Sequence, residues 1–124
     1  MEKYTILVCD DEKDLVSVLK ICLEAENYRV LEAYNGEQAL DILQKEKVHM
    51  VLMDVMMPVM DGYQATMEIR KLSNRALADI PIIAMTANAF AEDVQAAKTV
   101  GMNEHIAKPL DLRTLVRTLE KWLC

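Results

Sequence analysis

The sequence predicts an α/β fold in which a parallel sheet carries helices on both faces. Short apolar runs alternate with longer amphipathic stretches five times along the 124 residues. Several of these runs are apolar almost without interruption, as strands are when both faces of their sheet are buried. Strands that alternate with helices indicate βα units, whose crossovers set neighbouring strands in parallel. The length leaves room for one core, so we predict a single domain over residues 1–124.

Five short runs are predicted to form the sheet. The first, third and fourth are the most continuous in apolar character, whereas the fifth is short and weakly patterned. In chain order the predicted strands cover residues 4–9, 29–33, 49–53, 80–85 and 104–107.

The segments between the strands have helical spacing. Apolar residues that recur every three to four positions are expected to face the core, as in the first helix (Leu15, Leu19, Cys22) and the last (Leu112, Leu115, Leu119, Trp122). Asn35, with Gln38 three residues later, predicts a helix start, and Asp111 can cap the last helix in the same way. Gly101 suits the residue after the fourth helix, where a positive φ costs glycine little.

Composition excludes several classes of protein. A net charge of −6 opposes binding to a polyanion, so we expect no nucleic acid partner. The three cysteines are widely spaced and contain no CxxC pair, which argues against a disulfide framework or a zinc site. The sequence has no apolar run long enough to cross a membrane and no secretory signal pattern. We therefore expect a cytoplasmic protein that makes no membrane contact.

Polar residues gather where the predicted strands end. Asp10 and Asp11 follow the first strand, Asp54 the third, Thr86 the fourth and Lys108 the fifth. The carboxyl ends of parallel strands meet at one edge of a sheet, which is where ligands bind in such folds. The sequence therefore predicts that three carboxylates, a hydroxyl and an ammonium group converge.

Each of these residues also has an ordinary structural explanation. The aspartates and the threonine can cap helices or close turns, and the lysine can lie in solvent. Together they are harder to explain, because two carboxylates about 5 Å apart repel by roughly 3 kcal/mol at an effective dielectric of about 20. A divalent cation relieves this repulsion, and hard oxygen ligands favour Mg²⁺.

Asp54 is the best candidate for a reactive group. It follows an apolar run and has no basic neighbour in the sequence. Lys108 can supply the missing positive charge. A carboxylate flanked by a metal and a lysine is equipped to be a nucleophile toward phosphorus, while the Thr86 hydroxyl can hydrogen-bond a phosphoryl oxygen.

In their order and spacing these residues resemble a bacterial two-component response-regulator receiver domain. The similarity rests on Asp10 and Asp11, Asp54 with the segment through Gly62, Thr86 with Ala87, and Lys108 with Pro109. It covers essentially the whole chain. It implies a flavodoxin-like (βα)5 three-layer sandwich, like that of the chemotaxis regulators, with strand order 2-1-3-4-5. The segments around Thr86 and Gly101 are most similar to receivers of hybrid sensor histidine kinases.

The resemblance also assigns roles. Asp54 would be the phosphoacceptor, and Thr86 and Lys108 would contact the phosphoryl group. Mg²⁺, or Mn²⁺ in its place, would be bound by Asp11, by Asp54 and by the main-chain carbonyl of Met56, with Asp10 acting through water. Lys108–Pro109 would be a cis bond, which X-Pro bonds adopt only about 5% of the time.

Two residues depart from the family pattern. His105 stands where many members have an aromatic switch residue coupled to the threonine, so we interpret it as a partly exposed strand histidine rather than a pH sensor. Met56 lies two residues after the phosphoacceptor, and a thioether accepts hydrogen bonds only weakly. We therefore hypothesise slow self-dephosphorylation, because Met56 cannot orient the attacking water.

The resemblance implies a phosphorylation switch that is not an enzyme in its own right. A sensor histidine kinase or a histidine phosphotransfer domain would donate the phosphoryl group. Thr86 would then move toward it and change the face formed by the fourth helix, the fifth strand and the fifth helix, where a downstream protein binds. Two alternatives are a haloacid-dehalogenase-type phosphatase, whose second Asp would occupy the position of Met56, and a non-phosphorylated binding scaffold. The first segment lacks the glycine pattern of a dinucleotide site. A stand-alone receiver and a part of a larger protein both stay open.

Overall fold

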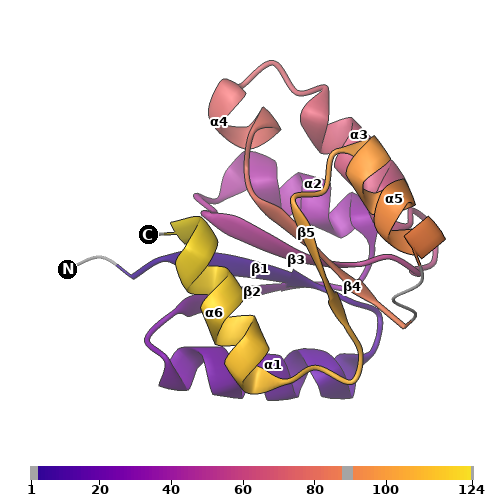
Figure 1. Ribbon diagram of the computed structural model, residues 1–124. Coiled ribbons are helices and arrows are strands. Elements are labelled where there is room, and N and C mark those ends of the chain that lie inside the picture. The colour runs from indigo at the N-terminus through magenta and orange to yellow at the C-terminus, as the bar shows by residue number, and fades with distance from the viewer. Residues whose placement is uncertain (1–2, 88–90, 124) are drawn as a thin grey trace.

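A computed structural model describes residues 3–87 and 91–123 of the chain (Figure 1). Its sheet has five parallel strands in the order β2-β1-β3-β4-β5, which confirms the predicted fold class and topology. The strands are β1 (Thr5–Cys9), β2 (Arg29–Ala33), β3 (Met50–Asp54), β4 (Ile82–Thr86) and β5 (Glu104–Ala107).

The strands agree with the predicted ranges to within two residues at each end. The largest difference is in β4, which begins at Ile82 rather than at residue 80. Pro81 has no N–H group to donate to a neighbouring strand, and the Ile80 N–H closes a turn on the Leu77 carbonyl. Asp54 and Thr86 are the last residues of β3 and β4, not the first residues after them.

Helices connect the successive strands and follow the last one. They are α1 (Lys13–Ala25), α2 (Gly36–Lys45), α3 (Gly62–Arg70), α4 (Arg75–Ala78), α5 (Ala91–Val100) and α6 (Leu112–Leu123), of which α3 and α4 both lie between β3 and β4. The single turn of α4 was not predicted from the sequence, because four residues are too few to show a helical period. It begins where the Asn74 side chain accepts hydrogen bonds from Ala76 N and Leu77 N. The helices predicted as fourth and fifth are therefore α5 and α6.

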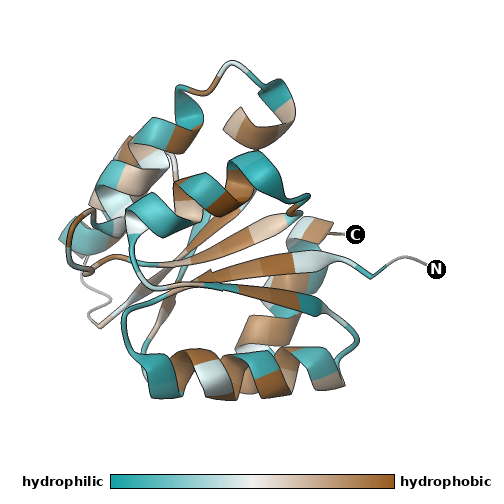
Figure 2. Cartoon of the chain, turned by 180° about the vertical axis from the view of Figure 1, so that it is seen from behind, coloured by the Kyte–Doolittle hydropathy of each residue, from teal (hydrophilic) through white to brown (hydrophobic). Residues whose placement is uncertain are grey.

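Helices cover the sheet on both faces, and two apolar clusters fill the space between the layers. Alternate strand residues point in opposite directions, so Leu7 and Cys9 pack with α2 and α3, whereas Ile6 and Val8 pack with α1 and α6. Figure 2 shows mostly apolar strands between helices in which hydrophilic and hydrophobic residues are interspersed. Burial of both faces explains why β1, β3 and β4 are almost continuously apolar.

The predicted helix ends are confirmed, and one predicted core residue is wrong. Asn35 Oδ1 accepts a hydrogen bond from Gln38 N, and Asp111 Oδ1 accepts one from Arg113 N. Gly101 has a φ of 105°, in the region that favours glycine. Leu112 is 43% exposed, because the first residue of α6 lies at the rim of the sandwich, where its side chain is only partly covered.

None of the helices in residues 3–87 and 91–123 has both the length and the apolarity needed to cross a bilayer. In the same part of the chain Cys9 is a buried free thiol and Cys22 a half-buried one.

Candidate functional site

Three carboxylates meet at the carboxyl end of the sheet, as the sequence predicts. Asp10 and Asp11 follow β1, and Asp54 ends β3, the strand beside it. Each residue contributes one carboxylate oxygen to a group whose members all lie within 4.8 Å of one another. Asp10 and Asp54 are buried, while Asp11 is exposed. The site therefore opens to solvent on the side of Asp11.

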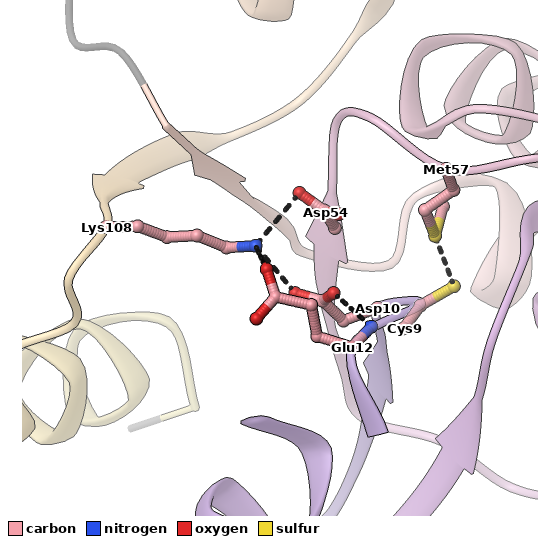
Figure 3. Close-up of polar contacts among 6 residues, drawn as sticks. All are labelled: Cys9, Asp10, Glu12, Asp54, Met57 and Lys108. Carbon is pink, nitrogen blue, oxygen red and sulfur yellow. Dashed lines mark hydrogen bonds and ion pairs between the residues drawn. The ribbon is translucent and has the colours of Figure 1, made fainter. Parts of the chain in front are cut away.

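Lys108 supplies positive charge to this cluster from the end of β5. Its Nζ lies 2.9 Å from Asp10 Oδ2 and 3.3 Å from Asp54 Oδ1, and a third carboxylate oxygen, on Glu12, is 3.9 Å away (Figure 3). The Lys108 backbone is fixed by a 2.7 Å hydrogen bond from its N–H to the Thr86 carbonyl. The bond to Pro109 is cis, as predicted.

The negative charges of the carboxylates in the cleft exceed the single positive charge of Lys108. Burial, followed by the charge of Asp10, raises the pKa of Asp54 to about 6, although Lys108 opposes this change. Burial lowers the pKa of Lys108, but the contacts with Asp10 and Asp54 outweigh it and leave that pKa above its ordinary value. Lys108 therefore stays charged, and one ammonium group faces more than one carboxylate.

Thr86 and Met56 lie in the same cleft. A hollow of about 300 Å³ is lined by Asp54, Thr86, Lys108 and Met56, together with Asp11. Within the described residues the Thr86 hydroxyl oxygen is buried and has no hydrogen-bond partner. His105 is half-buried on β5, paired with Ala84 and outside this hollow. The structure thus brings together every predicted site residue except His105.

Two residues of the cleft were missed by sequence reasoning. Tyr63 of α3 and Asp93 of α5 line the same hollow as Asp54 and Met56. Both belong to helices and neither follows a strand, so a search of strand ends does not find them. Their helical positions look like ordinary amphipathic surface in the sequence.

The loop between β3 and α3 holds Asp54 by close backbone contacts. Val59 has a φ of 67° and is the central residue of a tight turn in which Met60 N donates to the Pro58 carbonyl. Gly62 N donates to the Val55 carbonyl at 3.0 Å, and a side chain on Gly62 would collide with the Asp54 carbonyl. On the other side, the Cys9 thiol contacts Met57 (Figure 3).

The residues of the cleft fit a hard divalent cation. Two buried carboxylates and one exposed carboxylate provide oxygen ligands, and one lysine does not neutralise them. Burial, and after it the charge of Asp10, raises the pKa of Asp54, so a bound cation would favour its charged form. Oxygen ligands and access for water are typical of Mg²⁺ sites.

We expect Asp54→Ala to stabilise the protein when Mg²⁺ is absent. Asp54 lies within 4.8 Å of Asp10 and Asp11, and Lys108 keeps Asp10 as a partner when Asp54 is removed. Loss of the repulsion should raise the free energy of unfolding in EDTA by about 1–2 kcal/mol. Added Mg²⁺ should then stabilise the variant less than the parent. Thermal melting of both proteins with and without Mg²⁺ measures this, and a parent that melts identically in both conditions contradicts a metal site.

An apolar groove adjoins the cleft. It has a volume of about 560 Å³ and runs between α1 and the start of α6. Glu12 and Lys108 line both the groove and the cleft, while Leu15, Leu19 and Leu115 make the groove apolar. Val18 of α1 also lines the groove, and both Val18 and Ile21 of the same helix expose large side chains.

The chain matches a family model described as the response regulator receiver domain over residues 6–120. It is 37% identical to the sensor histidine kinase GacS of Pseudomonas protegens, over 94% of this chain and 13% of GacS. The chain spans about half the length, or less, of most of the curated relatives that it matches.

Solved structures agree with this assignment. The receiver domain of the sensor histidine kinase PA1611 from Pseudomonas aeruginosa, with a magnesium ion in its active-site cleft, is 36% identical. The match covers 98% of both chains with a TM-score of 0.89. The receiver domain of Ssk1 from Saccharomyces cerevisiae, in a complex with the histidine phosphotransfer protein Ypd1, is 26% identical with a TM-score of 0.92 and covers 98% and 90% of the two chains. The similarity to receivers of sensor kinases agrees with the prediction from the sequence.

The family match, the sheet order and the acidic cleft beside Lys108 lead to one conclusion. The chain belongs to the response regulator receiver domain family of two-component signalling.

Proposed function

We propose that this domain is a phosphorylation switch that accepts a phosphoryl group on Asp54 in a Mg²⁺-dependent reaction. The donor is a phosphohistidine of a sensor kinase or of a histidine phosphotransfer protein. The observation that carries the proposal is the contact of Lys108 with both Asp54 and Asp10 inside a cluster of three carboxylates. This arrangement leaves a nucleophilic oxygen beside fixed positive charge, at the edge of the sheet where ligands bind.

The transfer is a displacement at phosphorus. An oxygen of the Asp54 carboxylate forms a bond to phosphorus, and the bond from phosphorus to the histidine nitrogen breaks, so the imidazole leaves. The Lys108 ammonium group stabilises the negative charge on the phosphoryl oxygens. The Thr86 hydroxyl, which has no partner within the described residues, donates a hydrogen bond to one of these oxygens.

Four residues would hold the metal. Asp11, Asp54 and the main-chain carbonyl of Met56 would bind it directly, and Asp10 would assist through water. When bound, Mg²⁺ supplies the charge that offsets the clustered carboxylates and the incoming phosphoryl group. Asp10 also pairs with Lys108 at 2.9 Å, which positions the ammonium group near Asp54.

Phosphorylation would act on the face formed by α5, β5 and α6. Thr86 ends β4 and pairs with Ala107 of β5. A movement of Thr86 toward the phosphoryl group would therefore shift β5 as well. The added charge biases two packings of this face, one of which a downstream protein recognises. His105 lies on the same strand and is expected to adjust its packing with it.

The apolar groove supports a protein as the donor. It shares Glu12 and Lys108 with the cleft, so a helix lying in the groove would bring its histidine next to Asp54. The known complex of the Ssk1 receiver with Ypd1 supports the same class of partner. A small phosphodonor needs no such groove.

The proposal predicts that acetyl phosphate with Mg²⁺ adds one phosphoryl group to the protein and that Asp54→Asn abolishes the addition. An amide is a far weaker nucleophile than a carboxylate, so the loss should be complete. Intact mass spectrometry of both proteins measures it. Asp41→Asn is the matched control, because Asp41 is an exposed aspartate of α2 whose ion pair with Lys45 lies outside the cleft.

Other outcomes would favour the alternatives. Labelling of Asp54→Asn at the parental level would contradict Asp54 as the acceptor. A parent that is never labelled, with or without Mg²⁺, would favour a non-phosphorylated binding scaffold. Continuous turnover of a phosphomonoester would indicate a phosphatase.

A further inference from the structure

The methionines of the described chain fall into three groups by exposure: buried, half-buried and exposed. Four of them are fully or almost fully buried in the two apolar clusters: Met50, Met53, Met85 and Met102. Met56 is 76% exposed, more than any other large apolar residue described, and Met67 on α3 follows at 40%. Met57 and Met60 are half-buried. Among the described methionines, Met56 is therefore the most accessible to a dissolved oxidant.

Met56 is exposed inside the functional cleft. It lies two residues after Asp54 and lines the same hollow as Thr86 and Lys108. The other most exposed apolar residues, Val59 and Ile21, do not line this hollow. A chemical change at the Met56 side chain is therefore a change in the surroundings of Asp54.

Oxidation would turn this side chain from a weak hydrogen-bond acceptor into a strong one. Hydrogen peroxide transfers one oxygen atom to the thioether sulfur: the O–O bond breaks, sulfur loses two electrons and the peroxide leaves as water. The product is a sulfoxide, whose oxygen is a strong hydrogen-bond acceptor, whereas the thioether is a weak one. The reaction is reversed by methionine sulfoxide reductases.

We propose that Met56 is a reversible oxidation site through which peroxide shortens the lifetime of phosphorylated Asp54. The inference rests on the proposed function and adds a means of regulating it. Hydrolysis forms a bond from a water oxygen to phosphorus and breaks the bond to Asp54, which leaves as a carboxylate while phosphate and a proton enter solution. The sulfoxide oxygen of Met56 accepts a hydrogen bond from this water and orients it.

The buried thiol beside the site does not compete for the oxidant. Cys9 is fully buried between Met57 and the Asn35 carbonyl. Cys22 is only half-buried, and Cys124 lies outside the described residues. Both are therefore replaced by serine in the protein used for the test, so that peroxide acts on sulfur only at methionine.

The first measurement is a peptide map of this Cys22→Ser, Cys124→Ser protein during mild peroxide treatment. Met56 should form sulfoxide faster than Met67, in line with its greater exposure. Oxidation of Met67 at the same rate as Met56, or faster, would overturn the inference. This measurement needs no phosphorylation, so it stands apart from the test of the proposed function.

The second measurement is the rate at which labelled protein loses its phosphoryl group before and after peroxide treatment. We expect loss to be about fivefold faster after oxidation, which corresponds to one net hydrogen bond of about 1 kcal/mol. Met67→Leu should keep this response, and Met56→Leu should lose it because it has no sulfur in the cleft. Methionine sulfoxide reductase should restore the original rate.

The two ideas fail in different ways. If the unoxidised protein is never labelled by acetyl phosphate, the proposed function fails and the regulatory inference fails with it. If labelling is normal but the rate of loss is unchanged by Met56 sulfoxide, only the regulatory inference fails. A response that persists in Met56→Leu would assign the effect to another residue and overturn the inference as well.

Discussion

Replacing Arg70 by methionine should lower the free energy of unfolding by about 3–4 kcal/mol, because it leaves several buried carbonyl groups without donors. The guanidinium group makes five hydrogen bonds. Nη1 donates to the carbonyls of Ala78 and Ile80, at 2.8 and 2.7 Å. Nε and Nη2 both donate to the Gly101 carbonyl, and Nη2 also reaches Asn103 Oδ1. One side chain of α3 thus joins the segment before β4 to the segment before β5.

Urea denaturation measures this effect, and Arg75→Met is its control. Arg75 is exposed and only pairs with Asp79 at 3.6 Å, so its loss should change the free energy of unfolding by less than about 0.5 kcal/mol. Burial lowers the pKa of Arg70, but guanidinium groups stay charged in proteins, so the hydrogen bonds persist across ordinary pH. Equal denaturation midpoints for the two variants would show that the Arg70 contacts contribute nothing to stability.

Gly62→Ala should destabilise the protein by about 2–4 kcal/mol and slow phosphorylation by acetyl phosphate. A Cβ at this position would lie 2.3 Å from the Asp54 carbonyl oxygen and 3.0 Å from the Asp54 carbonyl carbon. These are backbone atoms, so they cannot move aside as a side-chain end does. The loop after β3 must shift, and the Asp54 carboxylate moves with it.

Thermal melting and intact mass after a fixed labelling time measure the two effects of Gly62→Ala. Gln64→Ala is the control, since Gln64 is exposed on the same helix and its N–H bond to Asp61 is unaffected. Labelling at the parental rate in a destabilised Gly62→Ala would contradict the coupling between this glycine and the position of Asp54.

The sheet and most of the cleft were predictable from the sequence because they depend on local patterns. Two-sided burial makes a strand continuously apolar, and the topology then brings the strand ends together, which is how Asp10, Asp54, Thr86 and Lys108 were found. The predicted cap of Asn35 on α2 depends on neighbours in sequence and was confirmed.

The features that were missed depend on contacts between distant segments. Arg70 is a basic residue in the last turn of a helix, which the sequence alone suggests to be solvent-exposed; its partners at Ala78 and Gly101 become visible only in the fold. Tyr63 and Asp93 reach the cleft because α3 and α5 pack near its rim. Leu112 fits the apolar period of α6 but is exposed. The period predicts the direction in which a side chain points, and it does not predict whether other residues cover that side chain.

The two outer strands carry charged residues that oppose the addition of a further strand. β2 and β5 each leave one edge without a neighbouring strand in the sheet. Arg29 and Glu32 of β2 form ion pairs with Glu46 and Lys20, and Glu104 of β5 binds the Trp122 indole and Lys121. A foreign strand that added to either edge would have to accommodate these charges, and the four residues of β5 offer it little length. We therefore expect the open edges to disfavour amyloid-like stacking.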